Sequence, residues 1–153
     1  MEENPELIKD LDKKWLKKMQ QCFFGTSYQS FIGAKNRSTP LHAGMTASFF
    51  IVAEGTKNWD IFPASYYPFF NPPPSGEGYF HSDLNVHTPD TTKYPGVNLL
   101  HRYQCQLKKG DILYLPGWMW HNVTNTSETW GVSYRFANIR SLLHQPTLTA
   151  VRI

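Results

Sequence analysis

The sequence predicts an all-β fold of the jelly-roll or double-stranded β-helix type, with an amphipathic helix at its N-terminal end. Aromatic residues make up 15% of the 153 residues, and glycine and proline together contribute 21 (10 + 11), a composition that favours strands joined by many turns. Short β-type runs follow one another along most of the chain, and one long proline-rich insertion interrupts them. Antiparallel strands with one such insertion are typical of a barrel with a single open mouth.

Residues 1–20 are expected to form the helix. Asn4 suits the N-cap position and Pro5 suits the first helical position. Apolar residues then recur at helical spacing on one face, and lysines occupy the other. The apolar residues are Leu7, Ile8, Leu11, Trp15, Leu16 and Met19. We expect this helix to pack on a sheet as a cover, and the alternative is a surface that binds a partner or a membrane.

The strand candidates begin after Gly25 and are bounded by Gly, Pro, Asn or Asp, as strands usually are. They cover residues 27–34, 48–53, 58–62, 99–107, 111–115, 121–124 and 129–136. The segments 54–56 and 108–111 each contain a glycine, and both are predicted to be tight turns of β-hairpins.

Residues 63–95 show no regular periodicity. The run Asn71-Pro-Pro-Pro-Ser-Gly76 cannot pair in a sheet, because proline has no N–H donor. A loop of this length is usually functional or disordered, so the segment is predicted to be a lid and specificity element. The tail over residues 137–153 contains a short helical candidate at 139–144.

Composition and charge argue against several classes of protein. A chain of this size is expected to form one domain over residues 1–153. The formal charge is only +3 and the lysines gather near the N-terminus, so no nucleic-acid partner is expected. No apolar run reaches about 18 residues and no signal-peptide pattern is present, so we expect no membrane partner. Cys22 and Cys105 are isolated, which favours a reducing, cytoplasmic location.

A series of short motifs runs from about residue 30 to residue 136. These are Thr39-Pro-x-His42, Phe49-Phe50, Gly55-x-Lys57, Ile61-Phe62-Pro63, Pro89-Asp90, Tyr94-Pro95, Gly110-Asp-Ile-Leu-Tyr-Leu-Pro116 and Trp120-His121. In order and spacing they resemble the jumonji-C and cupin-like Fe(II)/2-oxoglutarate-dependent oxygenases. The resemblance implies a cupin-like double-stranded β-helix, and Fe(II), 2-oxoglutarate and O2 as cofactors.

The same resemblance implies that His42 and His121 bind iron. Iron of this class takes imidazole and carboxylate ligands on one face and keeps open positions for cosubstrate and oxygen. Two histidines on distant strands of a barrel can meet at its mouth. Each imidazole has to bind in its neutral form, with its second ring nitrogen held by an acceptor.

Four further residues are assigned to 2-oxoglutarate by the resemblance. Lys57 is expected to pair with its distal carboxylate, because an ammonium inside a barrel is costly unless an anion meets it. The alternative is a lysine that faces solvent after a turn. Thr39 is expected to donate its hydroxyl to the same carboxylate, and Ser48 and Ser133 are expected to lie near the cosubstrate.

Gly44 departs from the family pattern, which has Asp or Glu at this position. A chloride or bromide ion in the vacated place would make the protein a halogenase, as in the relatives with His-x-Gly or His-x-Ala. Water in that place would preserve hydroxylation, as in the two-histidine hydroxylases. Loss of the metal would leave a non-catalytic cupin-like binding module. We expect an active enzyme that oxidises an unactivated C–H bond, and the His-x-Gly pattern ranks halogenation first.

His81-Ser-Asp83 is a rival motif, because with His121 it would supply two histidines and a carboxylate. It falls in the proline-rich insertion, with no strong strand after it and no lysine at the distance found in the family, and loops hold ligands less accurately than strands. His87, His101 and His144 have no motif that would place them at a metal. The expected substrate is a small molecule, and pairing of two copies into a homodimer through the C-terminal tail is left open.

Overall fold

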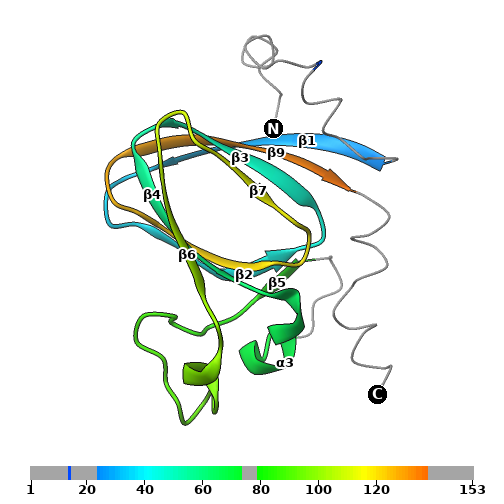
Figure 1. Ribbon diagram of the computed structural model, residues 1–153, viewed down its shortest axis with the longest axis vertical. Helices are drawn as coiled ribbons and strands as arrows, with labels where there is room; N and C mark the ends of the chain where they lie inside the picture. Colours follow the sequence, from blue (N-terminus) through cyan, green and yellow to red (C-terminus); the bar gives the residue numbers. More distant parts are fainter. Residues whose placement is uncertain (1–13, 15–23, 74–78, 138–153) are drawn as a thin grey trace.

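Two antiparallel sheets face each other in the computed structural model, which describes residue 14 and residues 24–73 and 79–137 (Figure 1). One sheet has the strand order β1-β9-β3-β7, and the other has the order β5-β2-β8-β4-β6. This arrangement confirms the predicted all-β, jelly-roll class. The predicted helix over residues 1–20, apart from Lys14, and the candidate at 139–144 lie outside the described residues.

The described strands include all seven predicted runs. They are β1 (Phe24–Gly33), β2 (Ser38–Gly44), β3 (Ala47–Glu54), β4 (Thr56–Phe62), β5 (Tyr79–His81), β6 (Tyr103–Lys108), β7 (Ile112–Leu115), β8 (Trp120–Asn125) and β9 (Thr129–Ala137). The run predicted over 99–107 begins late, at Tyr103, because a 3₁₀ helix, η2, occupies Val97–Leu99.

Strand β2 was not predicted, although it carries His42. Pro40 interrupts its sequence pattern, and the pairing of β2 with β8 shifts register between Thr39 and His42. A bulge of this kind accommodates a proline that cannot donate to the ladder. The sheet therefore continues through a segment that local pattern assigns to a turn.

Residues 63–95, predicted to form one long loop, contain three short elements. The segment begins with the 3₁₀ helix η1 (Ala64–Tyr66) and the short helix α3 (Tyr67–Phe70). It then returns as β5, which pairs with β2 at the edge of the sheet. Three residues are too few to show a strand periodicity, so β5 is specified by its partner rather than by its own sequence.

The two predicted turns are present, but neither belongs to a hairpin. Strand β3 pairs with β7 and β9, whereas β4 pairs with β6 and β8. The turns at Gly55 and Gly110 therefore carry the chain from one sheet to the other. Both glycines have positive φ angles, 79° and 91°, which residues with a side chain rarely adopt.

Gly55→Ala is expected to lower the free energy of unfolding by about 2 kcal/mol. A methyl group there would overlap the carbonyl oxygen of Glu128 and lie 2.7 Å from the Ser127 hydroxyl oxygen. Gly110→Ala is the matched control, since it has the same backbone strain but open space around the added carbon; its expected cost is about 1 kcal/mol. Urea denaturation measures both, and equal losses would contradict the packing argument.

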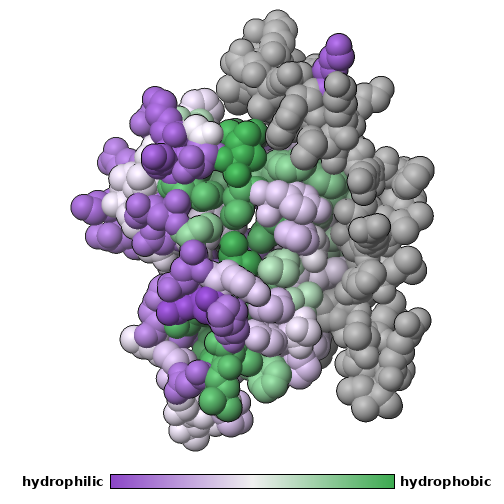
Figure 2. Space-filling model, in the orientation of Figure 1, coloured by the Kyte–Doolittle hydropathy of each residue, from purple (hydrophilic) through white to green (hydrophobic). Residues whose placement is uncertain are grey.

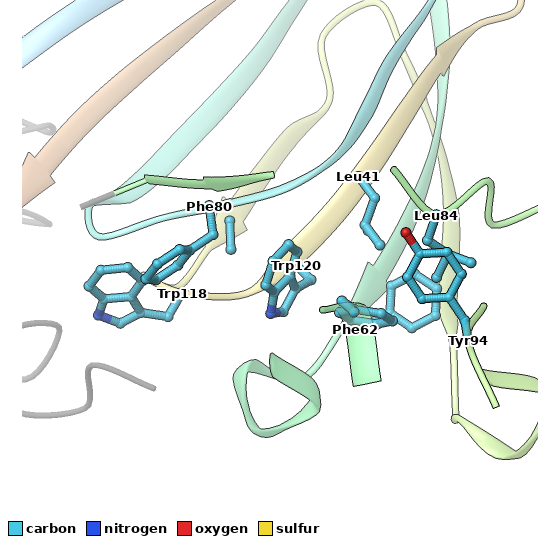
Figure 3. Packing of buried hydrophobic residues seen from close by; sticks show 9 residues of the cluster. Leu41, Phe62, Phe80, Leu84, Tyr94, Trp118 and Trp120 are labelled. Atoms are coloured by element: carbon cyan, nitrogen blue, oxygen red, sulfur yellow. The ribbon is translucent and has the colours of Figure 1, made fainter. Parts of the chain in front are cut away.

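The outer face of the β2–β8 sheet is covered by an aromatic cluster (Figure 3). Its buried members are Leu41, Ala43, Phe62, Phe70, Phe80, Leu84, Tyr94, Trp118 and Trp120. Because side chains alternate along a strand, the burial of Leu41 and Ala43 on this face turns His42 and Gly44 towards the space between the sheets. The core thus fixes the direction of the first histidine.

The surface seen in Figure 2 is hydrophilic at its left edge, over the turns that join the sheets, and carries hydrophobic residues in its middle. Two exposed side chains of this kind among the described residues are Ile112 and Tyr114 of β7. Among the described residues no helix is long and apolar enough to cross a membrane.

Candidate metal and anion site

A cavity of about 480 Å³ lies between the two sheets. Its lining includes all seven residues that the sequence nominated, namely Thr39, His42, Gly44, Ser48, Lys57, His121 and Ser133. They come from β2, β3, β4, β8 and β9. The topology therefore brings residues that are far apart in the chain to one enclosed volume of the size that small-ligand sites usually have.

His42 and His121 lie opposite each other on adjacent strands, with ring centroids 4.0 Å apart. Each ring uses Nδ1 in the same way: Nδ1 of His42 lies 2.7 Å from the carbonyl oxygen of Pro40, and Nδ1 of His121 lies 3.0 Å from that of Met119. A carbonyl only accepts, so Nδ1 is the protonated nitrogen in both rings. The Nε2 lone pairs are left for a metal.

Burial keeps both imidazoles neutral. It is the main cause that lowers the pKa of His42 to about 4, with the charges of His81 and Arg135 acting in the same direction. The pKa of His121 falls to about 3, mainly through burial and then through the charge of His42. Neutral imidazole is the form that binds metals, so both rings are ready to bind a cation near neutral pH.

These pKa shifts predict an acid-sensitive fold in the metal-free protein. The unfolded chain binds protons at histidine near pH 6.5, whereas the folded chain does so only near pH 4 and 3. Stability is therefore full above pH 6.5 and falls as the pH drops towards 4, by about 3 kcal/mol for each of the two histidines. Urea denaturation at several pH values measures this. A His42→Gln/His121→Gln variant should lose the dependence in that window, and the exposed His101→Gln should keep it.

Lys57 is a buried cation, with only 4% of its surface exposed. Its Nζ donates to Oδ1 of Asn125 at 2.7 Å and lies 5.7 Å from the centroid of the Phe50 ring. Burial lowers the pKa of this amine. Within the described residues it has no carboxylate partner. The alternative of a solvent-facing lysine is thus wrong, and the ammonium is available for an anion in the cavity.

The three hydroxyl residues differ in their setting. Ser48 and Ser133 are buried on β3 and β9. Thr39 lines the cavity too, but it is exposed. Its hydroxyl therefore lies at an open part of the wall, where water competes for it.

Gly44 faces Tyr79 of β5 across the sheet. A carbon added at Gly44 would lie 3.4 and 3.6 Å from two ring atoms of Tyr79. The place of the missing side chain is therefore bordered by an aromatic ring, as often happens where a strand glycine has an aromatic cross-strand neighbour.

The rival motif at residues 81–83 does not assemble with the histidine pair. His81 lies opposite His42 but is exposed, and the ring centroids are 6.0 Å apart. The side chain of Asp83 is 87% exposed and pairs with Lys93 at 3.4 Å. Across the described ranges, no three His, Cys, Asp or Glu side chains are grouped to hold a metal ion. Among the residues that the structure describes, the histidine pair therefore has no acidic companion.

Arg135 of β9 is a cavity residue that sequence reasoning missed. Its charge acts on both histidines, so it lies near their end of the cavity. The alternation Gly131, Ser133, Arg135 along one face of β9 was the available signal, because Ser133 had already been assigned to the interior.

The donor set fits a divalent transition metal. Two neutral imidazoles with Nδ1 held by backbone carbonyls satisfy the usual requirement for histidine ligands, and the cavity beside them has room for further ligands. Imidazole nitrogen suits iron, zinc, copper and nickel, so the pair itself does not select among them.

Fold and site together define a small β-barrel protein with a histidine pair and a buried lysine around one cavity. The cupin-like domain family matches residues 1–141. The chain therefore belongs to the cupin-like domain family.

Individual relatives match over shorter stretches. HSPB1-associated protein 1 of Rattus norvegicus is 30% identical over 96 residues, covering 61% of this chain and 20% of that protein. tRNA wybutosine-synthesizing protein 5 of Homo sapiens is 35% identical over 66 residues, covering 43% and 21%. The HSPB1-associated protein 1 homolog of Danio rerio is 33% identical over 100 residues, covering 61% and 21%. The aligned part spans about a fifth of the length of these relatives.

Proposed function

We propose that this chain is a non-haem Fe(II)/2-oxoglutarate-dependent oxidative enzyme that acts on an unactivated C–H bond. The proposal rests on one observation: a pair of neutral histidines shares a cavity with a buried lysine that has no carboxylate partner among the described residues. Membership of the cupin-like family supports it.

His42 and His121 would hold the iron through Nε2. Iron, 2-oxoglutarate and O2 supply the oxidising power when bound. The protein's own groups do the rest. Lys57 provides a desolvated charge for the distal carboxylate of the cosubstrate, with Thr39, Ser48 and Ser133 as hydroxyl donors beside it. Trp59, stacked on His121 with centroids 5.6 Å apart, helps to exclude water.

Two overall reactions are compatible with this site. In hydroxylation, one oxygen atom of O2 enters succinate, the other enters the product, and CO2 is released. In halogenation, a halide replaces hydrogen on the substrate, and the second oxygen atom leaves as water after taking up a proton. We propose halogenation as the finer function, with Gly44 as the halide site beside Tyr79, and hydroxylation as its alternative.

We propose a small-molecule substrate, in keeping with a cavity of about 480 Å³. The name of one relative concerns the synthesis of wybutosine in tRNA, so a modified nucleoside is one class to include in a substrate screen. A cytoplasmic location and the absence of nucleic-acid and membrane partners complete the proposal, and the pairing of two copies through the C-terminal tail stays open.

The test is oxygen-dependent conversion of 2-oxoglutarate to succinate by the iron-loaded protein. Wild type should form succinate, and the His42→Ala/His121→Ala variant should form none, while the exposed His101→Ala control should match wild type. No succinate from wild type, together with no bound iron, would leave a non-catalytic binding module. With chloride or bromide present, a shift in the iron absorption spectrum that Gly44→Asp abolishes would support the halide site; no shift would leave hydroxylation.

A further inference from the structure

The cavity has an unbalanced charge. Two cationic side chains line it, Lys57 and Arg135, whereas no Asp or Glu appears among its described lining residues. A volume with two fixed positive charges and no fixed negative charge is an anion-binding volume, because a desolvated cation without a counter-charge is costly.

Arg135 has no polar partner of its own within the described parts of the chain. Its guanidinium lies 5.9 Å from the centroid of the Phe31 ring, and its charge interacts with Tyr79. No hydrogen bond or ion pair to a described residue satisfies its N–H groups. The planar guanidinium has five such donors in a fork that suits carboxylates and other anions.

The two cations occupy different levels of the barrel. Lys57 lies opposite Asn125 on β8, and its bond to that side chain keeps the ammonium at that level. His121 is four residues away on the same strand, or about 14 Å at about 3.4 Å per residue. Arg135 lies opposite Ser48, near the start of β3, whereas Lys57 follows the turn at the end of β3.

A single small dicarboxylate anchored at Lys57 therefore leaves Arg135 without a counter-charge. The second carboxylate of that molecule would lie at the metal, between the level of Lys57 and the level of Arg135. Gly44, which supplies no carboxylate, lies beside Tyr79, and Tyr79 and Arg135 line the same cavity. The uncompensated charge and the missing acidic ligand thus fall in one part of the cavity.

We infer that Arg135 and Tyr79 form a second anion subsite beside the histidine pair, separate from the cosubstrate end at Lys57. The inference rests on the proposed function for the identity of the first anion. Its ligand is a small anion or anionic group, supplied either as a free halide or as the carboxylate of the organic substrate. Arg135 supplies the charge, and the Tyr79 hydroxyl is a neutral donor.

Thermal unfolding of the metal-free protein at constant ionic strength tests this, because a ligand that binds only the folded state raises its midpoint. Saturating 2-oxoglutarate should raise the midpoint, and bromide or acetate added on top should raise it again, each by about 3–6 °C at tenfold excess over the dissociation constant. Arg135→Gln should lose the second increase and keep the first. Lys57→Met should lose the first.

The exposed Arg37→Gln is the matched control for loss of one positive charge and should keep both increases. Arg135→Lys should keep the second increase in part, which separates loss of charge from misfolding. If bromide but not acetate causes the second increase in the midpoint, the ligand is a free halide. If acetate but not bromide causes it, the ligand is a substrate carboxylate. No second increase in wild type, or loss of the 2-oxoglutarate increase in Arg135→Gln, would overturn the inference. If 2-oxoglutarate failed to raise the midpoint of wild type while bromide or acetate still raised it, the result would count against the proposed cosubstrate and not against the second subsite.

Discussion

His42→Ala is expected to lower the affinity of the protein for Fe(II) by more than about a hundredfold. Removing a residue that merely orients a ligand already costs 10–100-fold in many metal sites, and this change removes one of two ligands. The centroid separation of 4.0 Å and the parallel use of Nδ1 by both rings make the pair a unit. Competition with a coloured chelator under anaerobic conditions measures the affinity.

Two variants make this measurement decisive. His121→Ala should cause a loss of similar size, because the two rings have equivalent roles. His81→Ala is the informative control, since His81 lies opposite His42 but is exposed and farther away. If His81→Ala weakened binding as much as His42→Ala, the metal would be held by a different set of residues.

Lys57→Met is expected to weaken 2-oxoglutarate binding by about 10–100-fold without lowering the free energy of unfolding. A hydrogen bond to a charged group contributes about 1.5–3 kcal/mol, and about 1.4 kcal/mol corresponds to a factor of ten. The fold should tolerate the change, because methionine replaces a desolvated ammonium with an apolar group of similar length. Calorimetric titration and urea denaturation measure the two effects.

The opposite pattern would count against the account of Lys57. If Lys57→Met unfolded more easily but bound 2-oxoglutarate as well as wild type, the lysine would serve the fold through Asn125 rather than the cosubstrate. Lys57→Arg separates charge from shape: the charge remains, but the planar fork replaces the point-like ammonium, so affinity should lie between the other two.

Much of the fold could be predicted because local pattern and tertiary structure agree over most strands. The alternation along β9 and the turn glycines at 55 and 110 can both be recognised from a short stretch of neighbouring residues. Strand β2 was not predicted because Pro40 breaks its sequence pattern. Strand β5 was not predicted because three residues are too few to show a strand periodicity. Both strands are specified by pairing partners distant in the chain, which no local window contains.

The site was predictable for a different reason. His42, Lys57 and His121 stand in recognisable motifs, so a resemblance could nominate them before any geometry was known. Arg135 stands in no such motif, and only the closure of the barrel brings it beside the histidines. Tyr79 was hidden in a segment assigned to a loop, although it borders Gly44. The motifs thus nominated cavity residues that stand in the quoted sequence patterns, and they missed cavity residues that stand in none.

A crystal structure of the protein soaked with Fe(II) and 2-oxoglutarate, with anomalous data at the iron edge, tests the central claim most directly. The account predicts one anomalous peak bonded to Nε2 of His42 and of His121, with the cosubstrate extending towards Lys57 and no protein carboxylate attached. A peak at another position, or an Asp or Glu oxygen bonded to the iron, would contradict it.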